Sequence, residues 1–247
     1  MEDGRERLRA NDYPGRGIIL GLDAAGRHLL QIYWITGRSA GSKNRILVIE
    51  GTDVRTQPFA ESGRTGDPNI YYRAIASVGG RHVVTNGDHT DVIIEHLARG
   101  DSFSGGLGVS PSFQSFEAAM RTQTYEDDPP NFTPRIAGLT DLTGARPEIA
   151  LATAVHGSTV DTLHSVYTYA ALEPGLGYCL HTYAGDGNPL PSFTQRPYEF
   201  ALRGSPADAA SDVWDLLPAG KRVALALKAI DVATKRVVTL TVRNTLG

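Results

Sequence analysis

The pattern of apolar and polar positions divides the chain into many short β-rich segments. Val83–Thr85, for example, is a β-branched run that ends at Asn86-Gly87, a dipeptide that readily turns the chain. Glycine, aspartate or asparagine separates many of the other runs, as is usual between strands. The predicted strands are Gly17–Leu22, His28–Ile35, Arg45–Glu50, Ile70–Val78, Arg81–Thr85, Arg135–Leu139, Glu148–Val155, His164–Ala171, Gly177–Tyr183, Arg222–Asp231 and Arg236–Val242.

Other segments place apolar residues at helical spacing. The clearest of them begins with Ser205 as N-cap and Pro206 in the first turn, and Ala209, Val213 and Leu216 then share one face. The other two predicted helices are Thr90–Arg99 and Phe113–Thr122.

Many strands, few helices and no regular alternation between them predict an α+β fold rather than a doubly wound α/β fold. We expect one domain over residues 1–247, with residues 1–12 as a flexible tail. The predicted loops are Asp53–Asn69, Gly100–Pro111 and Asp186–Arg196. The Gly105–Gly108 stretch in the second loop is too irregular for a dinucleotide-binding fingerprint.

Composition narrows the class of protein. A hydrophobic content of 41% is enough for a real core, and a net charge of −3 argues against a general nucleic-acid binder. No apolar run approaches the roughly 20 residues of a membrane span, and the charged start is unlike an export signal. The single cysteine, Cys179, excludes internal disulfides and has apolar neighbours that predict burial. We therefore expect a cytoplasmic protein without nucleic-acid or membrane partners.

The first polar segment that could carry chemistry is Thr36–Arg45. It contains Arg38, Lys43 and Arg45 and no acidic residue, together with glycines and small hydroxyl side chains. Such a loop lets the backbone approach an anion closely, most plausibly a phosphate. The alternative is a solvated hairpin turn with ordinary surface charges, and the loop by itself does not decide between the two.

The second polar segment is Asn86–Asp91, between a strand and a helix. Asp88 and Asp91 have the spacing of an N-cap and an N3 residue, and backbone N–H groups collect at such an edge. His89 is either a general acid or base or an ordinary polar surface residue. Because Asp88, His89 and Asp91 crowd into one turn without the usual ligand spacing, we expect no metal site.

The third polar segment is Thr124–Arg135, in which Glu126, Asp127 and Asp128 precede a proline pair. Neighbouring carboxylates raise each other's pKa, which suits a general base or acid near neutral pH. On composition alone, an acidic surface loop is the more common outcome.

Taken in order, these segments resemble the archaeal-type IMP cyclohydrolase family. Two specific matches are the Asn86–Asp91 turn and the segment Thr133-Pro-Arg-Ile136. The supporting matches are Tyr13-Pro-Gly-Arg16, Gly37-Arg38-Ser39, Asn44-Arg45, Tyr125-Glu-Asp-Asp128 and, more weakly, Gly177-Tyr178 with Tyr183. The chain departs from the family pattern at Gly37, in the length of the basic loop, and in Asp53–Asn69 and Asp186–Arg196, which look like insertions.

The resemblance implies a four-layer αββα sandwich of the N-terminal-nucleophile hydrolase type, with mostly antiparallel sheets but no covalent nucleophile. It implies closure of 5-formamidoimidazole-4-carboxamide ribotide to IMP with loss of water, without metal or cofactor, in a homo-oligomer. The departures leave two alternatives open. One is a cyclohydrolase or amidohydrolase acting on a related ribotide, and the other is a non-catalytic protein that binds purine nucleotides.

The resemblance also assigns roles to residues. Glu126 is the expected base, and Asn86, the Gly87–Asp88 amides and His89 are expected to face the carboxamide and formyl oxygens. Arg135 either pairs with Glu126 or binds substrate. The expected substrate-binding residues are Arg38, Ser39, Lys43, Asn44, Arg45, Tyr72, Gly87, Thr90, Asp91 and Tyr183.

Overall fold

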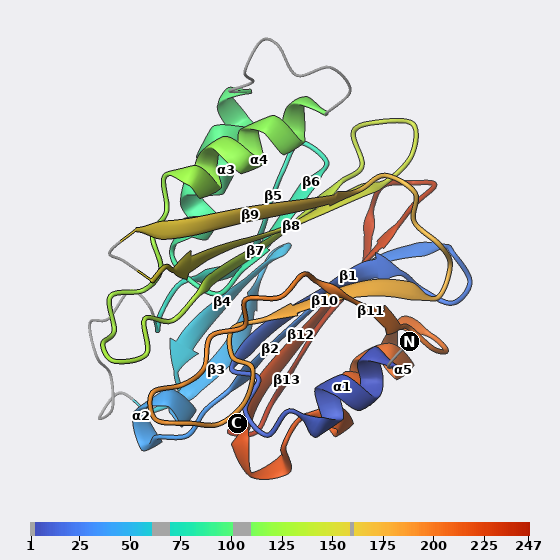
Figure 1. Ribbon diagram of the computed structural model, residues 1–247. Helices are drawn as coiled ribbons and strands as arrows, with labels where there is room; N and C mark the ends of the chain where they lie inside the picture. Colours follow the sequence, from blue (N-terminus) through green and yellow to red (C-terminus); the bar gives the residue numbers. More distant parts are fainter. Residues whose placement is uncertain (1–2, 61–69, 101–109, 159–160) are drawn as a thin grey trace.

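Two antiparallel sheets form the centre of the molecule (Figure 1). The computed structural model describes residues 3–60, 70–100, 110–158 and 161–247. In the six-stranded sheet the order is β11 (Tyr198–Ala201), β10 (Leu176–His181), β1 (Arg16–Leu22), β2 (His28–Thr36), β12 (Arg222–Asp231) and β13 (Val237–Asn244). In the seven-stranded sheet the order follows the chain: β3 (Arg45–Glu50), β4 (Asp53–Pro58), β5 (Arg73–Val78), β6 (Arg81–Thr85), β7 (Arg135–Asp141), β8 (Glu148–His156) and β9 (Thr162–Tyr169).

Helices cover the outer face of each sheet. The six-stranded sheet packs against α1 (Gly4–Ala10) and α5 (Pro206–Leu216), and the seven-stranded sheet against α3 (His89–Arg99) and α4 (Pro111–Arg121) (Figure 1). A short helix, α2 (Ala40–Lys43), joins β2 to β3, and the 3-10 helix η2 (Ala219–Lys221) precedes β12.

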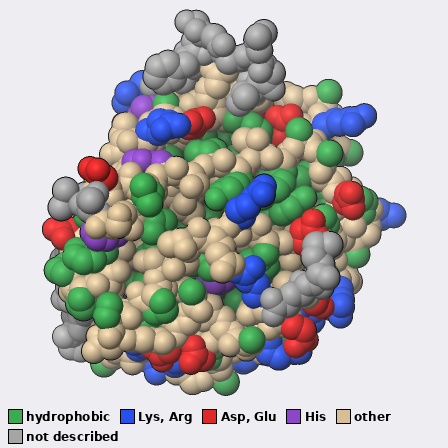
Figure 2. Space-filling model, in the orientation of Figure 1, with side chains coloured by type: hydrophobic (Ala, Val, Ile, Leu, Met, Phe, Trp, Pro, Cys, Tyr) green, Lys and Arg blue, Asp and Glu red, His purple; other side chains and the backbone are tan. Residues whose placement is uncertain are grey.

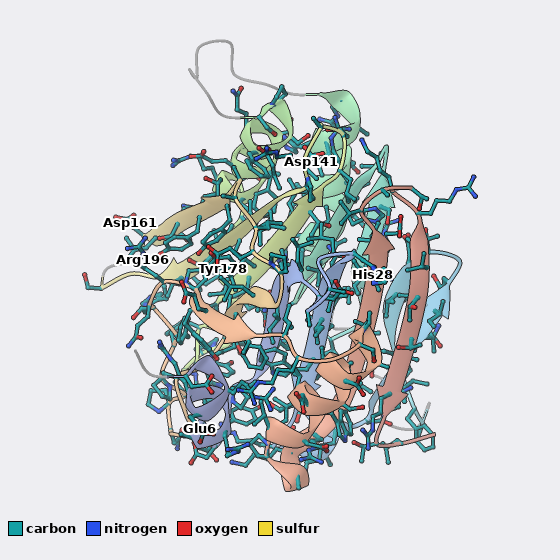
Figure 3. All side chains as sticks on the ribbon, turned by 90° about the vertical axis from the view of Figure 1, so that its right-hand side faces the viewer. Glu6, His28, Asp141, Asp161, Tyr178 and Arg196 are labelled. Atoms are coloured by element: carbon teal, nitrogen blue, oxygen red, sulfur yellow. The ribbon has the colours of Figure 1, made fainter. Side chains whose placement is uncertain are left out.

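The two-residue period of the strands separates the apolar side chains into layers. On β1, Ile18 and Leu20 join the core between the two sheets, whereas Ile19 joins the core beneath α1 and α5. At one side of the inter-sheet core, Tyr169 of β9 stacks on Tyr178 of β10 with ring centroids 3.7 Å apart; Tyr178 is labelled in Figure 3. The core therefore has apolar contacts on both faces of each sheet, which is why strands such as β1 are buried throughout.

The predicted α+β class, with two mostly antiparallel sheets and few helices, is confirmed. Every predicted strand and helix is present, with ends that shift by a few residues, and Ser205 caps α5 through a capping box with Asp208. The surface carries acidic and basic side chains mixed on the same face, as Figure 2 shows. No helix in the described ranges combines the length and apolar character needed to cross a bilayer.

Three expectations about irregular regions need correction. Residues 4–10 form α1 instead of a flexible tail, because Leu8 is buried under the sheet and Arg5 pairs with Asp212 at 2.7 Å. The predicted loop Asp53–Asn69 begins with β4, which pairs with β3 along its whole length. An edge strand, β11, was also missed because it is only four residues long. The predicted Gly105–Gly108 loop lies outside the described residues.

Candidate functional site

A cavity of about 360 Å³ lies where the start of β1, the end of β2 and the segment after α4 come together. Five separate parts of the chain contribute to its wall, including two of the three polar segments. Its lining residues are Tyr13, Gly15, Arg16, Thr36, Arg38, Ser39, Gly41, Ser42, Arg45, Ile70, Glu126, Asp128, Asn131, Thr133, Tyr183 and Leu190.

A buried ion pair forms one part of this wall. Arg16 Nη2 donates to Glu126 Oε2 at 2.9 Å, and Arg16 Nη1 donates to the carbonyl oxygen of Asn86 at 3.2 Å. Burial raises the pKa of Glu126, and the neighbouring Arg16 guanidinium opposes that increase. Glu126 is therefore a carboxyl group that accepts and releases a proton more readily near neutral pH than an exposed glutamate does.

Asn86 holds Glu126 from behind the cavity wall. Its Nδ2 donates to Pro134 O at 2.9 Å and to Glu126 Oε1 at 3.5 Å, and its Oδ1 accepts from Ile136 N at 2.7 Å. The side chain is fully buried and is absent from the cavity lining. Because Asn86 directly follows β6 and Ile136 lies in the neighbouring strand β7, this asparagine ties the Glu126 segment to the sheet.

The basic loop forms another part of the wall. Arg45 is buried, and its Nε donates to Ser42 O at 2.9 Å, but it forms no ion pair with a carboxylate among the described residues. Arg38 also lines the cavity and pairs with Asp186 at 2.6 Å. Ser39 and Ser42 close the capping box of α2. A buried guanidinium that faces a cavity without a carboxylate partner is a site for an anion.

Two tyrosines form an aromatic side of the cavity. The rings of Tyr13 and Tyr183 stack with centroids 5.7 Å apart and an interplanar angle of 16°. The hydroxyl of Tyr183 is hydrogen-bonded to that of Thr133, which donates in turn to Asp128 Oδ2 at 2.6 Å. Burial raises the pKa of Tyr183 to about 12, so its hydroxyl stays protonated. The rings present a flat apolar surface with polar edges, which suits a heteroaromatic ring.

The Asn86–Asp91 turn lies against the cavity wall instead of within it. Thr90 is fully buried, with its Oγ1 2.5 Å from Thr85 Oγ1, and Gly87 O accepts from Thr90 at 3.2 Å. Asp88 occupies the N-cap position, but its side chain makes no capping bond and pairs with Arg135 at 2.6 Å. Asp91 pairs with Arg73 at 2.6 Å. The predicted N-cap and N3 carboxylates therefore serve in ion pairs.

His89 is buried and neutral. Its Nε2 donates to Ile136 O at 3.1 Å, so Nδ1 carries the lone pair that accepts from Arg135 Nη1 at 3.0 Å. Burial, with Arg135 as a smaller contributor, lowers the pKa of His89 to about 3. The structure thus gives this histidine and Arg135 a place behind the cavity, where His89 is unsuited to proton transfer near neutral pH.

Three expected substrate-binding residues make other contacts. Lys43 Nζ donates to Gly220 O at 2.9 Å, and Asn44 exchanges two hydrogen bonds of 2.9 Å with the backbone of Ala60. Tyr72 lies in the inter-sheet core, with its hydroxyl 2.5 Å from that of Tyr33. None of the three is among the cavity-lining residues.

Sequence reasoning did not assign a role to several residues that line the cavity. Tyr13, Arg16 and Thr133 entered the sequence analysis only as parts of the matched family motifs, without a role of their own. The available signal was the position of Arg16, a charged residue at the start of an otherwise apolar strand. A guanidinium at that position needs a buried partner, and Glu126 supplies it.

The site offers acid–base chemistry beside an anion pocket. In the described ranges, no group of three or more histidine, cysteine, aspartate or glutamate side chains is arranged to hold a metal ion. Cys179 lies beneath α1 and α5, away from the cavity, and burial raises the pKa of its thiol to about 12. The Glu126 carboxyl and the guanidinium groups around it are thus the groups in the cavity on which the proposed chemistry rests.

Comparison with known proteins agrees with this arrangement. The family model for IMP cyclohydrolase-like proteins matches residues 13–235, a range that contains every cavity-lining residue. The IMP cyclohydrolases of Halobacterium salinarum and Haloquadratum walsbyi are each 31% identical to the chain over 127 residues, and that of Methanococcus maripaludis is 32% identical over 126 residues. These matches cover 51% of this chain and 56% of each relative, so the chain spans about half the length of the curated relatives it matches. On the extent of the family match, the chain belongs to the IMP cyclohydrolase-like family.

Proposed function

We propose that this protein is an IMP cyclohydrolase that closes 5-formamidoimidazole-4-carboxamide ribotide to IMP and releases water. The observation that carries the proposal is the buried Arg16–Glu126 pair in the same cavity as Arg45, a guanidinium without a carboxylate partner among the described residues. The Arg16–Glu126 pair suits proton transfer at an amide, and the Arg45 guanidinium suits binding of a phosphate. The names of the relatives support the same reaction.

The proposed binding mode follows from the distribution of charge. The 5′-phosphate binds Arg45 and Arg38, whose guanidinium groups donate bidentate hydrogen bonds to phosphate oxygens. The imidazole lies along the stacked Tyr13–Tyr183 pair, which places its two substituents toward Glu126. Both reacting groups are on one ring, so the site holds the reactive rotamer, an effect that can contribute about 7–11 kcal/mol to catalysis.

In the first step, the carboxamide nitrogen attacks the formyl carbon. Glu126 takes a proton from that nitrogen as the carbon–nitrogen bond forms, because a neutral amide is a poor nucleophile. Negative charge develops on the formyl oxygen and is stabilised by Arg16, which takes the role first expected of the Asn86–Asp91 turn. Glu126 then passes this proton to the oxygen, which completes a neutral cyclic carbinolamine.

In the second step, the carbinolamine loses water. Glu126, again ionised, takes the proton of the former formamide nitrogen and delivers it to the hydroxyl group; the carbon–oxygen bond breaks, water leaves, and the carbon–nitrogen double bond forms. A single carboxyl group therefore serves as base and then as acid. A raised pKa suits both roles, since the protonated form is then more available at a given pH than in an exposed glutamate.

Two residues position the reactive carboxyl. Asn86 links Glu126 to Pro134 O and Ile136 N, and Asp128 accepts from both the backbone N and the hydroxyl of Thr133 at 2.7 and 2.6 Å. These bonds fix the turn that follows Glu126, whose own backbone N donates to Thr133 O at 2.9 Å. Asn86 thus acts through Glu126 in this proposal and does not contact substrate.

The proposal extends to the rest of the molecule. We propose that the succession of helices, sheet, sheet and helices is the four-layer sandwich of the N-terminal-nucleophile hydrolases, used as a single domain over residues 1–247 without a covalent nucleophile. The packing of α1 and α5 on one sheet, and of α3 and α4 on the other, supports it. We also propose a cytoplasmic homo-oligomer; the single buried cysteine supports a reducing compartment, and family resemblance supports oligomerisation.

The test is an absorbance assay of IMP formation by the purified protein, without added metal or cofactor. We expect turnover that Glu126→Gln lowers by about 10²–10⁴-fold, the usual contribution of a general acid–base group. Glu117→Gln is the matched control, because Glu117 is on α4 and pairs with Arg121 on the surface. Binding of IMP without turnover would indicate a nucleotide-binding protein, and turnover of only another carboxamide ribotide would identify a different substrate.

A further inference from the structure

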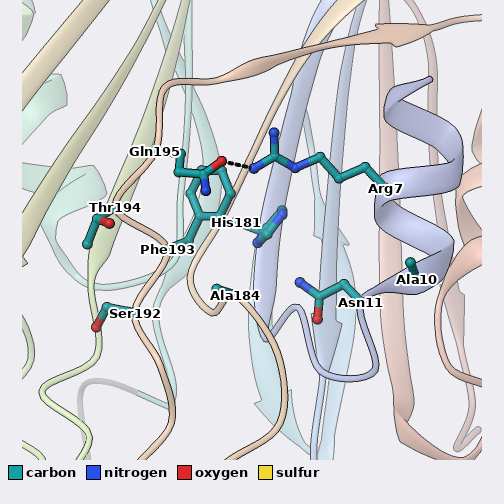
Figure 4. Close-up of a pocket in the computed structure, with 9 residues that line it drawn as sticks. All are labelled: Arg7, Ala10, Asn11, His181, Ala184, Ser192, Phe193, Thr194 and Gln195. Carbon is teal, nitrogen blue, oxygen red and sulfur yellow. Dashed lines mark hydrogen bonds between the residues drawn. The ribbon is translucent and has the colours of Figure 1, made fainter. Parts of the chain in front are cut away.

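A second cavity, of about 250 Å³, lies between α1 and the loop that follows β10 (Figure 4). None of its lining residues is acidic, and nothing in the proposed reaction uses it. The lining residues are Arg7, Ala10, Asn11, His181, Ala184, Ser192, Phe193, Thr194 and Gln195.

Arg7 supplies positive charge to this second cavity. Its guanidinium carbon lies 5.2 Å from the ring centroid of Phe193 and 4.4 Å from that of Tyr198. Its Nη2 donates to Gln195 Oε1, a bond drawn in Figure 4. Within the described ranges Arg7 forms no ion pair. A guanidinium oriented by two rings and one amide retains donors for an oxyanion.

His181 supplies an acceptor without a partner. Its Nδ1 lies 3.0 Å from Tyr183 O, and because a carbonyl oxygen only accepts, Nδ1 carries the proton. The other ring nitrogen, Nε2, then has a free lone pair, and this buried atom has no hydrogen-bond partner in the described part of the chain. Burial lowers the pKa of His181 to about 3, so the ring stays neutral and keeps that lone pair. A ligand that satisfies it must bring an O–H or N–H group.

We propose that this second cavity binds a small oxyanion that also carries a hydroxyl group: the anionic oxygens contact Arg7 and the hydroxyl donates to His181 Nε2. Monohydrogen phosphate and a hydroxycarboxylate share this chemistry. The cavity is near the lower limit of ligand pockets, which fits a molecule of this size.

The site adjoins the first cavity through shared hydrogen bonds. The carbonyl oxygen of Tyr183 accepts from His181 Nδ1 and from Asn11 Nδ2 at 2.9 Å, while Asn11 Oδ1 accepts from Tyr13 N at 2.9 Å. The backbone of the stacked Tyr13–Tyr183 pair is thus held by residues that line the second cavity. The inference does not depend on which reaction the first cavity catalyses.

The test follows the ring nitrogens of nitrogen-15-labelled histidine by NMR during titration with inorganic phosphate, with His181→Phe identifying the His181 signals. We expect a saturable upfield change of the His181 Nε2 signal at millimolar phosphate, glycolate or both. Sulfate and acetate, which lack the hydroxyl, should bind at least about fivefold more weakly. A response to phosphate alone or to glycolate alone supports the site and identifies the anionic group.

Variants test the proposed contacts. Arg7→Gln should weaken binding about tenfold or more, whereas Arg9→Gln on the same helix should leave it unchanged, since Arg9 is exposed and bonded to Glu6. If Arg7→Gln fails to fold, Arg7→Lys is the second variant. It keeps the positive charge but loses the paired N–H donors of the guanidinium, and should weaken binding by a smaller factor. Arg45→Gln should have no effect, which separates this site from the first cavity. No saturable change with either probe, equal binding of sulfate and acetate, or indifference to Arg7 would overturn the proposal.

Discussion

Arg16 and Glu126 meet at 2.9 Å although 110 residues separate them in the chain. Only 10% of the arginine side chain and 4% of the glutamate side chain are exposed. Burial and pairing have opposite effects on the pKa of Glu126, and the increase caused by burial is the larger. The pair is therefore expected to govern how the protein responds to pH.

The first prediction concerns the pH dependence of activity. The ionised form of Glu126 is the proposed base, so kcat/KM should rise with pH through a midpoint above the ordinary glutamate pKa. The negative charge of Asp128 contributes to the raised pKa, so Asp128→Asn should move this midpoint to lower pH, and Asp127→Asn, at an exposed neighbour, serves as the control. A midpoint at or below the ordinary value, or an upward movement in Asp128→Asn, would contradict the assignment.

The second prediction separates the two ends of the basic loop. Arg45 lines the cavity, whereas Lys43 donates to Gly220 O outside it. Arg45→Gln should raise the Kd for IMP by about 10- to 100-fold, the usual effect of losing a charge-assisted hydrogen bond. Lys43→Gln should change the Kd by less than about threefold, as expected for an exposed charge. Calorimetric titration with IMP measures both, and equal effects of the two variants would remove Arg45 from the phosphate site.

The third prediction concerns acid stability. The folded-state pKa of His89 is about 3, below the ordinary histidine value of 6.5, so between these values the unfolded chain binds a proton that the folded protein does not. The free energy of unfolding should therefore fall as pH falls from 6.5 towards 3, by about 1.4 kcal/mol per pH unit for this histidine. Urea denaturation across this range should show a slope smaller by about that amount in His89→Gln. An unchanged slope would mean that His89 titrates alike in both states.

The fourth prediction concerns the turn before β1. Gly15 has a φ of +70°, and a Cβ there would lie 2.1 Å from Thr182 Oγ1. Gly51 has a similar φ of +65°, but a Cβ at that position would have nothing within 4 Å, which makes it a matched control. Gly51→Ala should cost about 1–2 kcal/mol for the left-handed backbone alone. Gly15→Ala should cost about 1–3 kcal/mol more, because the new methyl group clashes.

Chemical denaturation of both glycine variants measures the difference. Gly15→Ala should also weaken IMP binding, since the residue lines the cavity beside Arg16. Equal losses of stability in the two variants would show that the Thr182 contact relaxes without cost.

The local elements of the fold could be predicted from sequence because their signals are local. The capping box of Ser205 and Asp208, for example, lies within four consecutive residues. The same kind of signal misled at Asp88, whose spacing to Asp91 fits a cap. Arg135 and Arg73, brought there by β7 and β5, provide ion-pair partners that a pattern along one segment does not reveal.

The sequence indicated several individual residues of the candidate site, but not which of them come together. Among the residues that the sequence singles out, Glu126, Arg38, Ser39, Arg45 and Tyr183 line the cavity, because polar residues next to glycine or proline turns are often placed at the ends of strands. Arg16 was not assigned a role, because nothing in its neighbourhood along the chain indicates the acidic partner. His89 was assigned to chemistry from its type, whereas burial makes it neutral.

By itself, the sequence determined most of the strands, the main helices, the α+β class and the family, since each depends on periodicity, caps or motifs within short segments. Only the tertiary structure decided which polar segments meet. The Thr36–Arg45 and Thr124–Arg135 segments share a cavity, while the Asn86–Asp91 turn supports it from behind. The physical reason is that the packing of one sheet on the other brings Arg16 to Glu126, and burial then sets which side chains carry charge.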